Sequence, residues 1–211
     1  MTQTVGRDDD GIVGCWSCHG PVAARALFCH TCGAVQPPPQ VDHFTRLGLP
    51  REFEIDAAEL DRRYFGFQRN LHPDRFARRT ARERAIAESQ SASLNQAYET
   101  LKEPLTRAAY LLELAGIRSA ATHAATVDDE ELLNEAMENR EALMEASDVD
   151  AVDELTSRAL AAAVACLADL AAAFHRNDLD AANRLTTRMR YWRKLGEEAR
   201  GKRRLLEGTA L

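Results

Sequence analysis

The sequence is poor in aromatic side chains, and this deficit narrows the fold classes that it can adopt. Only 6% of its residues are aromatic, whereas alanine, leucine, glutamate and arginine dominate the second half of the chain. Because these residues favour helices and strand-forming residues are sparse, the composition predicts an all-α fold. The 211 residues, of which 45% are hydrophobic, suffice for one or two compact units and a small accessory module.

The chain also lacks the positive charge that nucleic-acid-binding proteins usually carry. Its formal net charge is −6 and its isoelectric point is near 5.6, which argues against binding of DNA or RNA by bulk electrostatics. The charge is unevenly distributed, because eight arginines lie between residues 60 and 84, whereas residues 128–154 contain twelve acidic residues and one arginine. The two regions are therefore expected to attract different partners.

Long apolar runs and targeting patterns are not evident in the sequence either. No hydrophobic stretch approaches the ~20 residues needed to cross a bilayer. The first residues, MTQTVGRDDDG, have neither a secretory nor a transit-peptide pattern. We therefore expect a cytoplasmic, bacterial protein that contacts no membrane, with the mitochondrial matrix as the alternative compartment.

Cysteine is scarce, but its distribution is informative. Four of the five cysteines form two C-x-x-C pairs separated by ten residues, namely Cys15, Cys18, Cys29 and Cys32. Two such pairs supply four thiolates to a tetrahedral ion, and one structural Zn²⁺ fits this all-sulfur set best. Iron is an alternative that the spacing does not separate from zinc. Disulfides or a thioredoxin-like redox pair fit less well, because the chain reads as cytosolic and lacks a βαβ pattern.

Helical periodicity begins after a stiff spacer, Pro37–Pro39. The pattern predicts a helical turn over 42–47, long helices over 56–71 and 81–102 that are separated by a break at Pro73, and a short helix over 104–116. After a polar connection at 122–126, a helix that begins at Asp128 and two more are predicted to pack as a bundle. Cys166, on an alanine-rich face of that bundle, is interpreted as a buried small side chain.

His72, Pro73 and Asp74 lie between the two long predicted helices. The proline ends the first helix and fixes a loop that presents an imidazole and a carboxylate to solvent. The helix before the loop has an apolar stripe and an opposite basic face. The stripe consists of Leu60, Tyr64, Phe67 and Leu71, and the basic face of Arg62, Arg63 and Arg69. We interpret the arginines as a functional surface because they adjoin the loop, and a merely solvated face is the alternative.

These segments together resemble a known family. The basic helix, the HPD tripeptide and a returning helix with SLNQAYETLKEP resemble a J-domain, and SASLNQAYETLKEPLTRAAYLLELAGI is similar to the HscB (Jac) family of iron-sulfur co-chaperones. The segment CWSCHGPVAARALFCHTCGAVQPP resembles the zinc module of some members. The resemblance implies that His72, Pro73 and Asp74 trigger ATP hydrolysis in a DnaK/HscA-type chaperone, with the three arginines in support.

The resemblance also implies that the C-terminal bundle binds an iron-sulfur scaffold protein of the IscU type. The stretch LLNEAMENREAL matches the binding surface of the family and suggests Leu133, Met137, Glu138 and Glu141, completed by Tyr191 from the last helix. Asn134 departs from the apolar residue often seen at its position. Leu133 and Met137 also recur at the spacing of a core-facing stripe, so a core role stays open for both. The other members of that stripe are Ala136, Arg140 and Met144.

The predicted organisation is a zinc module with a Pro-rich linker (1–40), a J-domain (41–116) and a scaffold-binding three-helix bundle (117–211), which leaves self-association open. The predicted function is that of a non-enzymatic co-chaperone that delivers the scaffold to the chaperone and stimulates its ATPase. The sequence offers no nucleophile–base pair and no phosphate-cradling glycine loop. The alternatives are a J-domain protein with other clients, a zinc-ribbon nucleic-acid-binding protein and a thiol-disulfide redox protein.

Overall fold

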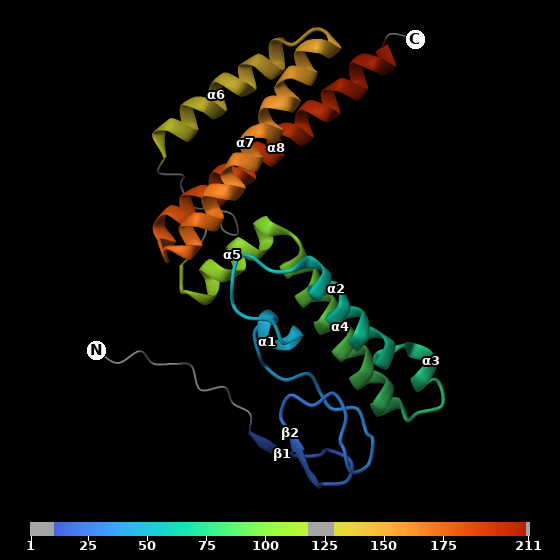
Figure 1. Ribbon diagram of the computed structural model, residues 1–211. Coiled ribbons are helices and arrows are strands. Elements are labelled where there is room, and N and C mark those ends of the chain that lie inside the picture. The colour runs from blue at the N-terminus through green and yellow to red at the C-terminus, as the bar shows by residue number, and fades with distance from the viewer. Residues whose placement is uncertain (1–10, 118–128, 210–211) are drawn as a thin grey trace, which may run out of the picture. The chain divides into compact units, whose positions relative to one another are not determined.

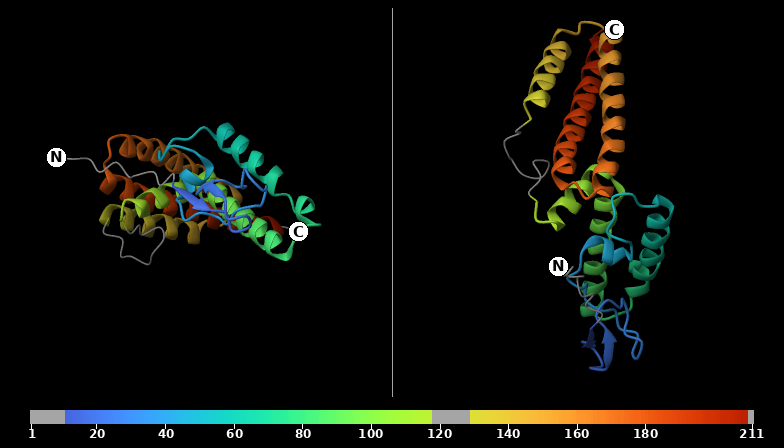
Figure 2. Two further views of the ribbon diagram at one scale, coloured as in Figure 1. Left: turned by 90° about the horizontal axis from the view of Figure 1, so that it is seen from below. Right: turned by 60° about the vertical axis from the view of Figure 1, so that its left-hand side comes forward.

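The computed structural model describes residues 11–117 and 129–209, which form two compact units. The first unit comprises Met1–Arg51 and Ile55–Lys102, and the second comprises Glu52–Glu54 and Glu103–Leu211. Helices dominate both units (Figure 1, Figure 2), which confirms the predicted fold class. The predicted boundaries between segments fall after residues 40 and 116. The contacts within the structure instead group the cysteine-rich module with the helical hairpin, and they place the helix that begins at Pro104 in the second unit.

The cysteine-rich module contains a short β-hairpin that was not predicted from the sequence. Strands β1 (Ile12–Gly14) and β2 (Pro21–Ala23) pair antiparallel, with Val13 opposite Val22. Four buried residues of the module form one small hydrophobic cluster, which consists of Cys15, Val22, Cys29 and Ala34. So few apolar side chains cannot hold a module of this size together without a further crosslink.

Four helices follow in the first unit, and the two long ones have strong start signals. They are α1 (His43–Leu47), α2 (Ala57–Leu71), α3 (Pro73–Phe76) and α4 (Ala81–Lys102). Asp56 caps α2 by accepting the backbone N–H of Ala58 at 2.9 Å. Thr80 and Glu83 form a capping box at the start of α4, in which each side chain accepts the backbone N–H of the other residue. These caps explain why the predicted bounds of both helices are confirmed.

Helices α2 and α4 pack against each other through the predicted apolar stripe of α2. Leu60 and Leu71 are buried at the two ends of this stripe. Between them, the ring of Tyr64 stacks on that of Tyr98 with centroids 4.0 Å apart, and the Tyr64 hydroxyl donates to Asn95 Oδ1 at 3.0 Å. The opposite face of α2 is therefore left for solvent or a partner.

Asp42 caps α1 and supplies a test of the stability of the first unit. Its Oδ1 accepts the backbone N–H of Thr45 at 3.0 Å, and its Oδ2 accepts Nη2 of Arg51 at 2.6 Å. Burial alone raises the pKa of Asp42, but hydrogen bonds from Thr45 and Arg51 outweigh burial and hold this pKa below its usual value.

We expect the Asp42→Ala substitution to lower the free energy of unfolding by about 1 kcal/mol at pH 7, the usual value of a helix cap. Because the pKa of Asp42 is lower in the folded than in the unfolded state, its stabilisation is present above roughly pH 4 and is lost as the pH falls through the folded-state pKa. Denaturant titrations of both proteins at several pH values check this. A difference that stays constant down to pH 2 would contradict it.

The described residues of the second unit form four helices and a short inserted segment. The helices are α5 (Pro104–Leu114), α6 (Glu130–Glu145), α7 (Val149–His175) and α8 (Leu179–Thr209). Phe53 from the inserted segment stacks on Phe174 with centroids 5.0 Å apart and lies beneath the guanidinium of Arg107 at 5.2 Å. Cys166 is buried in the same cluster, as predicted, and burial raises the pKa of its thiol. The predicted connection at 122–126 and Asp128 lie outside the described residues.

Helix α6 turns a different face to the bundle from the predicted one. Its buried residues are Leu132 and Leu143, whereas Leu133, Met137 and Met144 are 47%, 73% and 76% exposed. The core interpretation of the stripe is therefore wrong for Leu133, Met137 and Met144. The true core residues are offset by one position from this stripe, so the exposed side chains are available for another role.

Polar contacts hold α6 against α8. Arg188 of α8 donates to the carboxylates of Asp129, Glu131 and Glu135 at 3.4, 3.2 and 2.8 Å. At the other end of α6, the ammonium of Lys202 donates to two of its last backbone carbonyls. Only two residues of α6, both leucines, are buried. The polar contacts therefore help to fix the rotation of α6 about its axis.

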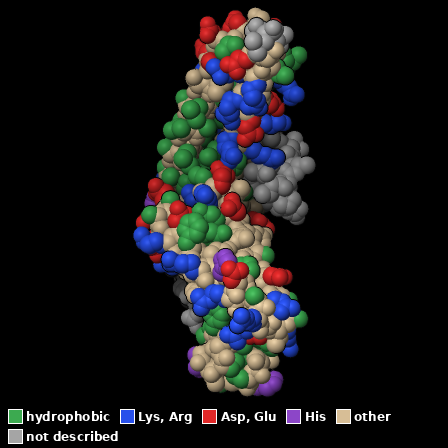
Figure 3. All heavy atoms as spheres, turned by 90° about the vertical axis from the view of Figure 1, so that its right-hand side faces the viewer, with side chains coloured by type: hydrophobic (Ala, Val, Ile, Leu, Met, Phe, Trp, Pro, Cys, Tyr) green, Lys and Arg blue, Asp and Glu red, His purple; other side chains and the backbone are tan. Residues whose placement is uncertain are grey.

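Helix α7 is the one described helix that is long and apolar enough, by length and composition alone, to cross a membrane. This finding corrects the expectation that no segment approaches such a length. A single helix of this kind is weak evidence for a span, because core helices have the same composition, and α7 packs along α8. Only 22% of its most apolar window is buried. Hydrophobic side chains gather on one side of this unit (Figure 3). Leu160 and Val164 of α7 are both exposed.

Candidate metal centre and binding surfaces

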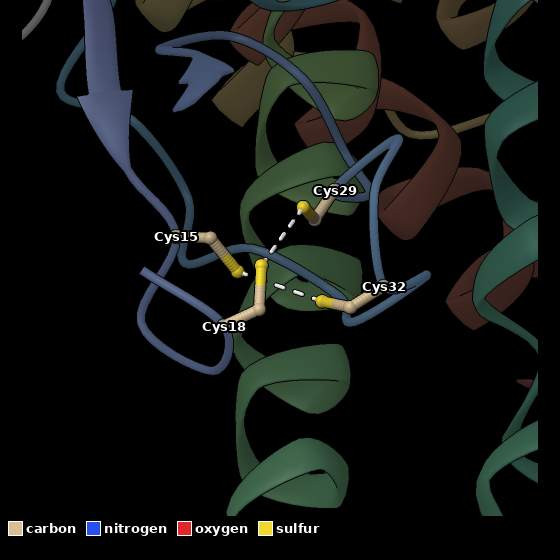
Figure 4. A group of neighbouring side chains, drawn as sticks. All are labelled: Cys15, Cys18, Cys29 and Cys32. Atoms are coloured by element: carbon tan, nitrogen blue, oxygen red, sulfur yellow. Dashed lines mark hydrogen bonds between the residues drawn. The ribbon is translucent and has the colours of Figure 1, made fainter. Parts of the chain in front are cut away.

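The four N-terminal cysteines converge on one point (Figure 4). Their Sγ atoms all lie within 4.8 Å of one another, and the pairs Cys15–Cys32 and Cys18–Cys29 are 3.8 Å apart. Four sulfurs at about 2.3 Å from a central zinc form a tetrahedron with edges of about 3.8 Å. A disulfide requires about 2.05 Å, and all five cysteines, which lie within the described residues, are free thiols. The residues therefore fit a tetrahedral metal ion.

The two C-x-x-C knuckles share one backbone design. The N–H of Cys15 donates to the carbonyl of Gly20, and the N–H of Cys29 donates to that of Ala34, in both cases five residues on. The residue four positions after each first cysteine has a positive φ, which is 61° at His19 and 71° at Gly33. This turn directs both thiols of each knuckle to the same side. The spacing of the cysteines predicts the ligands, and the repeated turn explains how the chain presents them.

The protein environment favours the thiolate form of two of the four cysteines. The backbone N–H groups of Cys18 and Ser17 and the side-chain amide of Gln36 stabilise the Cys15 thiolate and lower its pKa to about 6. A hydrogen bond from the backbone of Cys32 likewise lowers the pKa of Cys29. At Cys18, the hydrogen bond from the backbone of Gly20 lowers the pKa, but hydrogen bonds with the neighbouring thiols and burial outweigh it and raise the pKa to about 11. Thiolates this close repel one another, so a divalent cation between them removes a cost that the bare cluster would carry.

The HPD loop lies at the far end of the α2–α4 hairpin and is open to solvent. The side chains of His72 and Asp74 are 61% and 91% exposed. Pro73 occupies the first position of α3, and Nδ1 of His72 accepts the backbone N–H of Asp74 at 3.3 Å. This hydrogen bond orients the imidazole and leaves Nε2 and the Asp74 carboxylate for a partner.

The three predicted arginines of α2 divide into two groups. Arg63 donates to the carbonyl oxygens of Leu47, at 3.3 Å, and of Gly48, which lie at the C-terminal end of α1, and it also pairs with Glu59. Arg62 pairs with Glu59 as well but is largely exposed, and Arg69 is exposed close to the HPD loop. Arg63 therefore joins α1 to α2, whereas Arg62 and Arg69 form the solvent-facing part of the basic surface.

On α6, four of the five predicted scaffold-binding residues lie on an exposed surface. They are Leu133, Met137, Glu138 and Glu141, and we call them the α6 surface. Tyr191 of α8 is half-buried beneath α6, and its hydroxyl donates to the backbone carbonyl of Glu135 at 3.4 Å. Tyr191 thus supports α6 from below, while the α6 surface itself points outward.

Comparisons with known proteins agree with this architecture. The family profile of the HSCB C-terminal oligomerisation domain matches residues 128–200. The human iron-sulfur cluster co-chaperone protein HscB is 35% identical over 193 residues, which cover 90% of this chain and 82% of the human protein. The crystal structure of human co-chaperone protein HscB, 35% identical, superposes with a TM-score of 0.80 over 89% of this chain and 97% of that one. This chain belongs to the HscB family.

A bacterial structure extends the comparison. The chaperone HscB from Vibrio cholerae is 32% identical, with a TM-score of 0.68 over 79% of this HscB-family chain and 99% of the bacterial one. Further HscB relatives come from a plant and from bacteria, so the compartment of this chain stays a prediction. The name of the family profile includes the word oligomerisation, but this name describes the domain across the family. Self-association of this chain therefore also stays a prediction.

Three residues near the candidate sites of this HscB-family chain were not predicted from its sequence. Gln36 donates through Nε2 to Cys15 Sγ at 3.4 Å, although the cysteine spacing gives no sign of it. Phe65 is exposed on α2 between Arg62 and Arg69. Met144 is exposed two turns beyond Met137; its spacing places it on the same stripe, but it was not predicted to be a scaffold-binding residue.

Proposed function

We propose that this HscB-family chain is a co-chaperone of iron-sulfur cluster assembly that binds a scaffold protein of the IscU type through the α6 surface and presents the scaffold to a DnaK/HscA-type chaperone. The names of its relatives, which include an iron-sulfur cluster co-chaperone protein, support the general role. The observation that carries the specific proposal is the exposure of Leu133 and Met137 on α6.

The α6 surface has the chemistry of a protein-binding site. Met137 is a flexible apolar side chain that adapts to a partner, and Leu133 lies one turn away on the same side of the helix. Glu138 and Glu141 give this patch an acidic rim, so a partner with basic residues around an apolar centre would be complementary. A helix held in place by Arg188 and Lys202 presents these groups at little cost in entropy.

The HPD loop supplies the second half of the proposal. Pro73 fixes the loop, and the exposed His72 and Asp74 are free to contact the ATPase domain of a chaperone. Arg69 adds positive charge close to the loop and Arg62 adds it near the start of α2, and this charge would steer an acidic surface of the chaperone toward the hairpin. Because the loop and the α6 surface belong to one chain, a bound scaffold is held at high effective concentration near the chaperone. No chemical step is required of this protein.

We infer that the metal of the four-cysteine site is zinc and that its role is structural. Four thiolates fill a tetrahedral shell, so no position is left for a substrate. When bound, the ion supplies a crosslink between the two knuckles. The residues Cys15, Cys18, Cys29 and Cys32 would hold it, and Gln36, which is not itself a ligand, would stabilise the Cys15 thiolate through its side-chain amide.

Replacing Leu133 and Met137 by alanine together tests the scaffold-binding proposal. Loss of two anchors from the centre of an interface costs about 2–3 kcal/mol, so we expect the affinity for a purified scaffold to fall about 30- to 150-fold. Both side chains are exposed, and the fold should therefore survive the substitutions. Isothermal titration of the wild-type and double-variant proteins gives the two dissociation constants.

Leu160→Ala is the matched control for this titration, because Leu160 is a similarly exposed aliphatic residue on α7. We expect the control to bind the scaffold like the wild type. Tyr191 is not used, since its hydroxyl contacts α6 and its loss would disturb the helix as well. Equal affinities of the double variant and the wild type would contradict the assignment of the α6 surface.

A further inference from the structure

The cysteine-rich module is joined to α4 of the hairpin by a pair of buried amides. Gln36 and Gln90 are 6% and 1% exposed. The Nε2 of Gln90 donates to the backbone carbonyl of Gln36 at 2.8 Å, and the Nε2 of Gln36 donates to Sγ of Cys15 at 3.4 Å and to the carbonyl of Ala34 at 2.8 Å. Two residues therefore connect a metal-ligating sulfur to the middle of α4.

A second contact lies two turns earlier on the same helix. Trp16, which follows Cys15 directly, donates through its indole N–H to the carbonyl of Val35 at 2.7 Å. The guanidinium of Arg82, in the first turn of α4, lies over the Trp16 ring at 4.3 Å from its centroid. Because Arg82 and Gln90 are eight residues apart, the two contacts are separated by about 12 Å along one side of α4.

The module also reaches the end of the hairpin that carries the HPD loop. A hollow of about 230 Å³ is bordered by Phe28 and Gly33 from the module and by residues at this end of the hairpin, namely Asn70, Arg75, Phe76, Arg79 and Glu83. In Figure 4, α4 runs directly behind the four cysteines. The module thus lies along the first half of α4, which is the half that begins next to the loop.

We propose that the metal module is a brace for the HPD hairpin, in which Gln36 and Gln90 are positioning residues that couple metal binding to the order of α4. The inference rests on the metal centre of the proposed function, but it does not depend on any chaperone or scaffold. The competing arrangement is a module that folds by itself and is merely tethered through Pro37–Pro39.

The energetics of the buried amides support a brace. Among the described residues, Oε1 of Gln90 has no hydrogen-bond partner, so the bond to Gln36 is the main polar contact of a side chain that is shielded from water. If the module unfolds, Gln90 loses this contact, and Trp16 leaves Arg82. If metal binding orders α4 through these contacts, then by thermodynamic reciprocity the same contacts must make the metal bind more tightly.

Metal release from the full-length chain tests this reciprocity. The zinc-loaded protein is mixed with an excess of a chromogenic chelator, and the rate of zinc transfer is followed for the wild type and for the Gln90→Ala, Arg82→Ala and Asn95→Ala variants. Gln90 holds Gln36, which in turn contacts the ligand Cys15. Loss of a direct outer partner of a ligand typically weakens a metal site ten- to a hundredfold, so for Gln90→Ala we expect the low end of this range, about tenfold faster release. The exposed Arg82 can be replaced without risk to the fold, and Arg82→Ala should release zinc about threefold faster.

Asn95→Ala is the matched control, because Asn95 is an amide on the same helix whose partners, Tyr64 and Gln68, both lie on α2. It should release zinc at the wild-type rate. In parallel, hydrogen exchange of residues 82–90 should be at least about tenfold faster after the zinc is removed, whereas exchange in α7 and α8 should not change.

Wild-type rates of release from both Gln90→Ala and Arg82→Ala, or exchange in α4 that is indifferent to zinc, would show a tethered module and overturn the brace. If the chain takes up no zinc, both the assignment of the metal centre and the brace are refuted. A measured content of no zinc per chain distinguishes this outcome from the others. Failure of the co-chaperone function would leave both measurements unaffected, because neither contains a chaperone or a scaffold.

Discussion

Replacing His72 by glutamine is expected to abolish stimulation of the chaperone's ATPase and to leave scaffold binding unchanged. His72 is exposed at the end of α2, and its imidazole is oriented by the backbone N–H of Asp74. Glutamine keeps the length of the side chain but lacks the rigid ring, so its amide is not held in the orientation that the Asp74 N–H gives the imidazole. If the imidazole is a central contact of the docked complex, its loss costs about 2 kcal/mol or more, which is about a 30-fold loss of productive docking.

The measurement is ATP turnover by a DnaK-type chaperone at increasing concentrations of wild-type or His72→Gln protein, with scaffold affinity measured separately. His175→Gln is the matched control, since His175 is an exposed histidine on α7, and it should stimulate like the wild type. The loss of the α3 cap should destabilise the fold only slightly, which circular dichroism can verify. Normal stimulation by His72→Gln would refute the role proposed for the loop.

Removing the metal is expected to unfold residues 11–36 while the second unit stays folded. The small core of the module comprises four residues, two of which are themselves ligands. Binding of a structural zinc provides about 10 kcal/mol or more of apparent free energy, so almost all of the module's stability depends on it. Hydrogen exchange before and after chelation should show loss of protection in β1 and β2, and Cys29→Ser should reproduce it.

Metal analysis of the purified protein completes this test. We expect one zinc per chain and no visible absorption, because Zn²⁺ is d¹⁰, whereas an iron tetrathiolate site would be coloured. Cys166→Ala is the control, since Cys166 is buried in the second unit and should leave the zinc content unchanged. Bound iron, or a module that keeps its protection without metal, would refute the assignment of a structural zinc.

Local chemistry explains which helices could be predicted from the sequence. Asp56 and the Thr80–Glu83 capping box are unambiguous start signals, and Pro73 and Pro104 stand at the first turns of their helices. The bounds of α2 and α4 follow from such neighbours alone. The spacing of the four cysteines likewise determines a ligand set without any knowledge of the rest of the chain.

The rotation of α6 could not be predicted in this way. Both of its faces carry apolar residues, and hydrophobic periodicity alone does not choose between the face with Leu132 and the face with Leu133. The choice depends on Arg188, which is more than fifty residues away and contacts Glu135. Gln36 and Gln90 are similarly distant in sequence, so their hydrogen bond leaves no local pattern. Polar contacts between residues far apart in the sequence therefore determine features of the fold that no local pattern predicts.

The insertion of Glu52–Glu54 into the second unit has an evolutionary consequence. Neither unit is one continuous stretch of chain, because the polypeptide leaves the first unit after Arg51, returns at Ile55 and leaves again after Lys102. A single genetic crossover with an unrelated gene near codon 102 would therefore separate Phe53 from Phe174, which leaves an unfilled cavity in one product and a stranded aromatic ring in the other. Recombination should consequently transmit the two units together rather than as interchangeable cassettes.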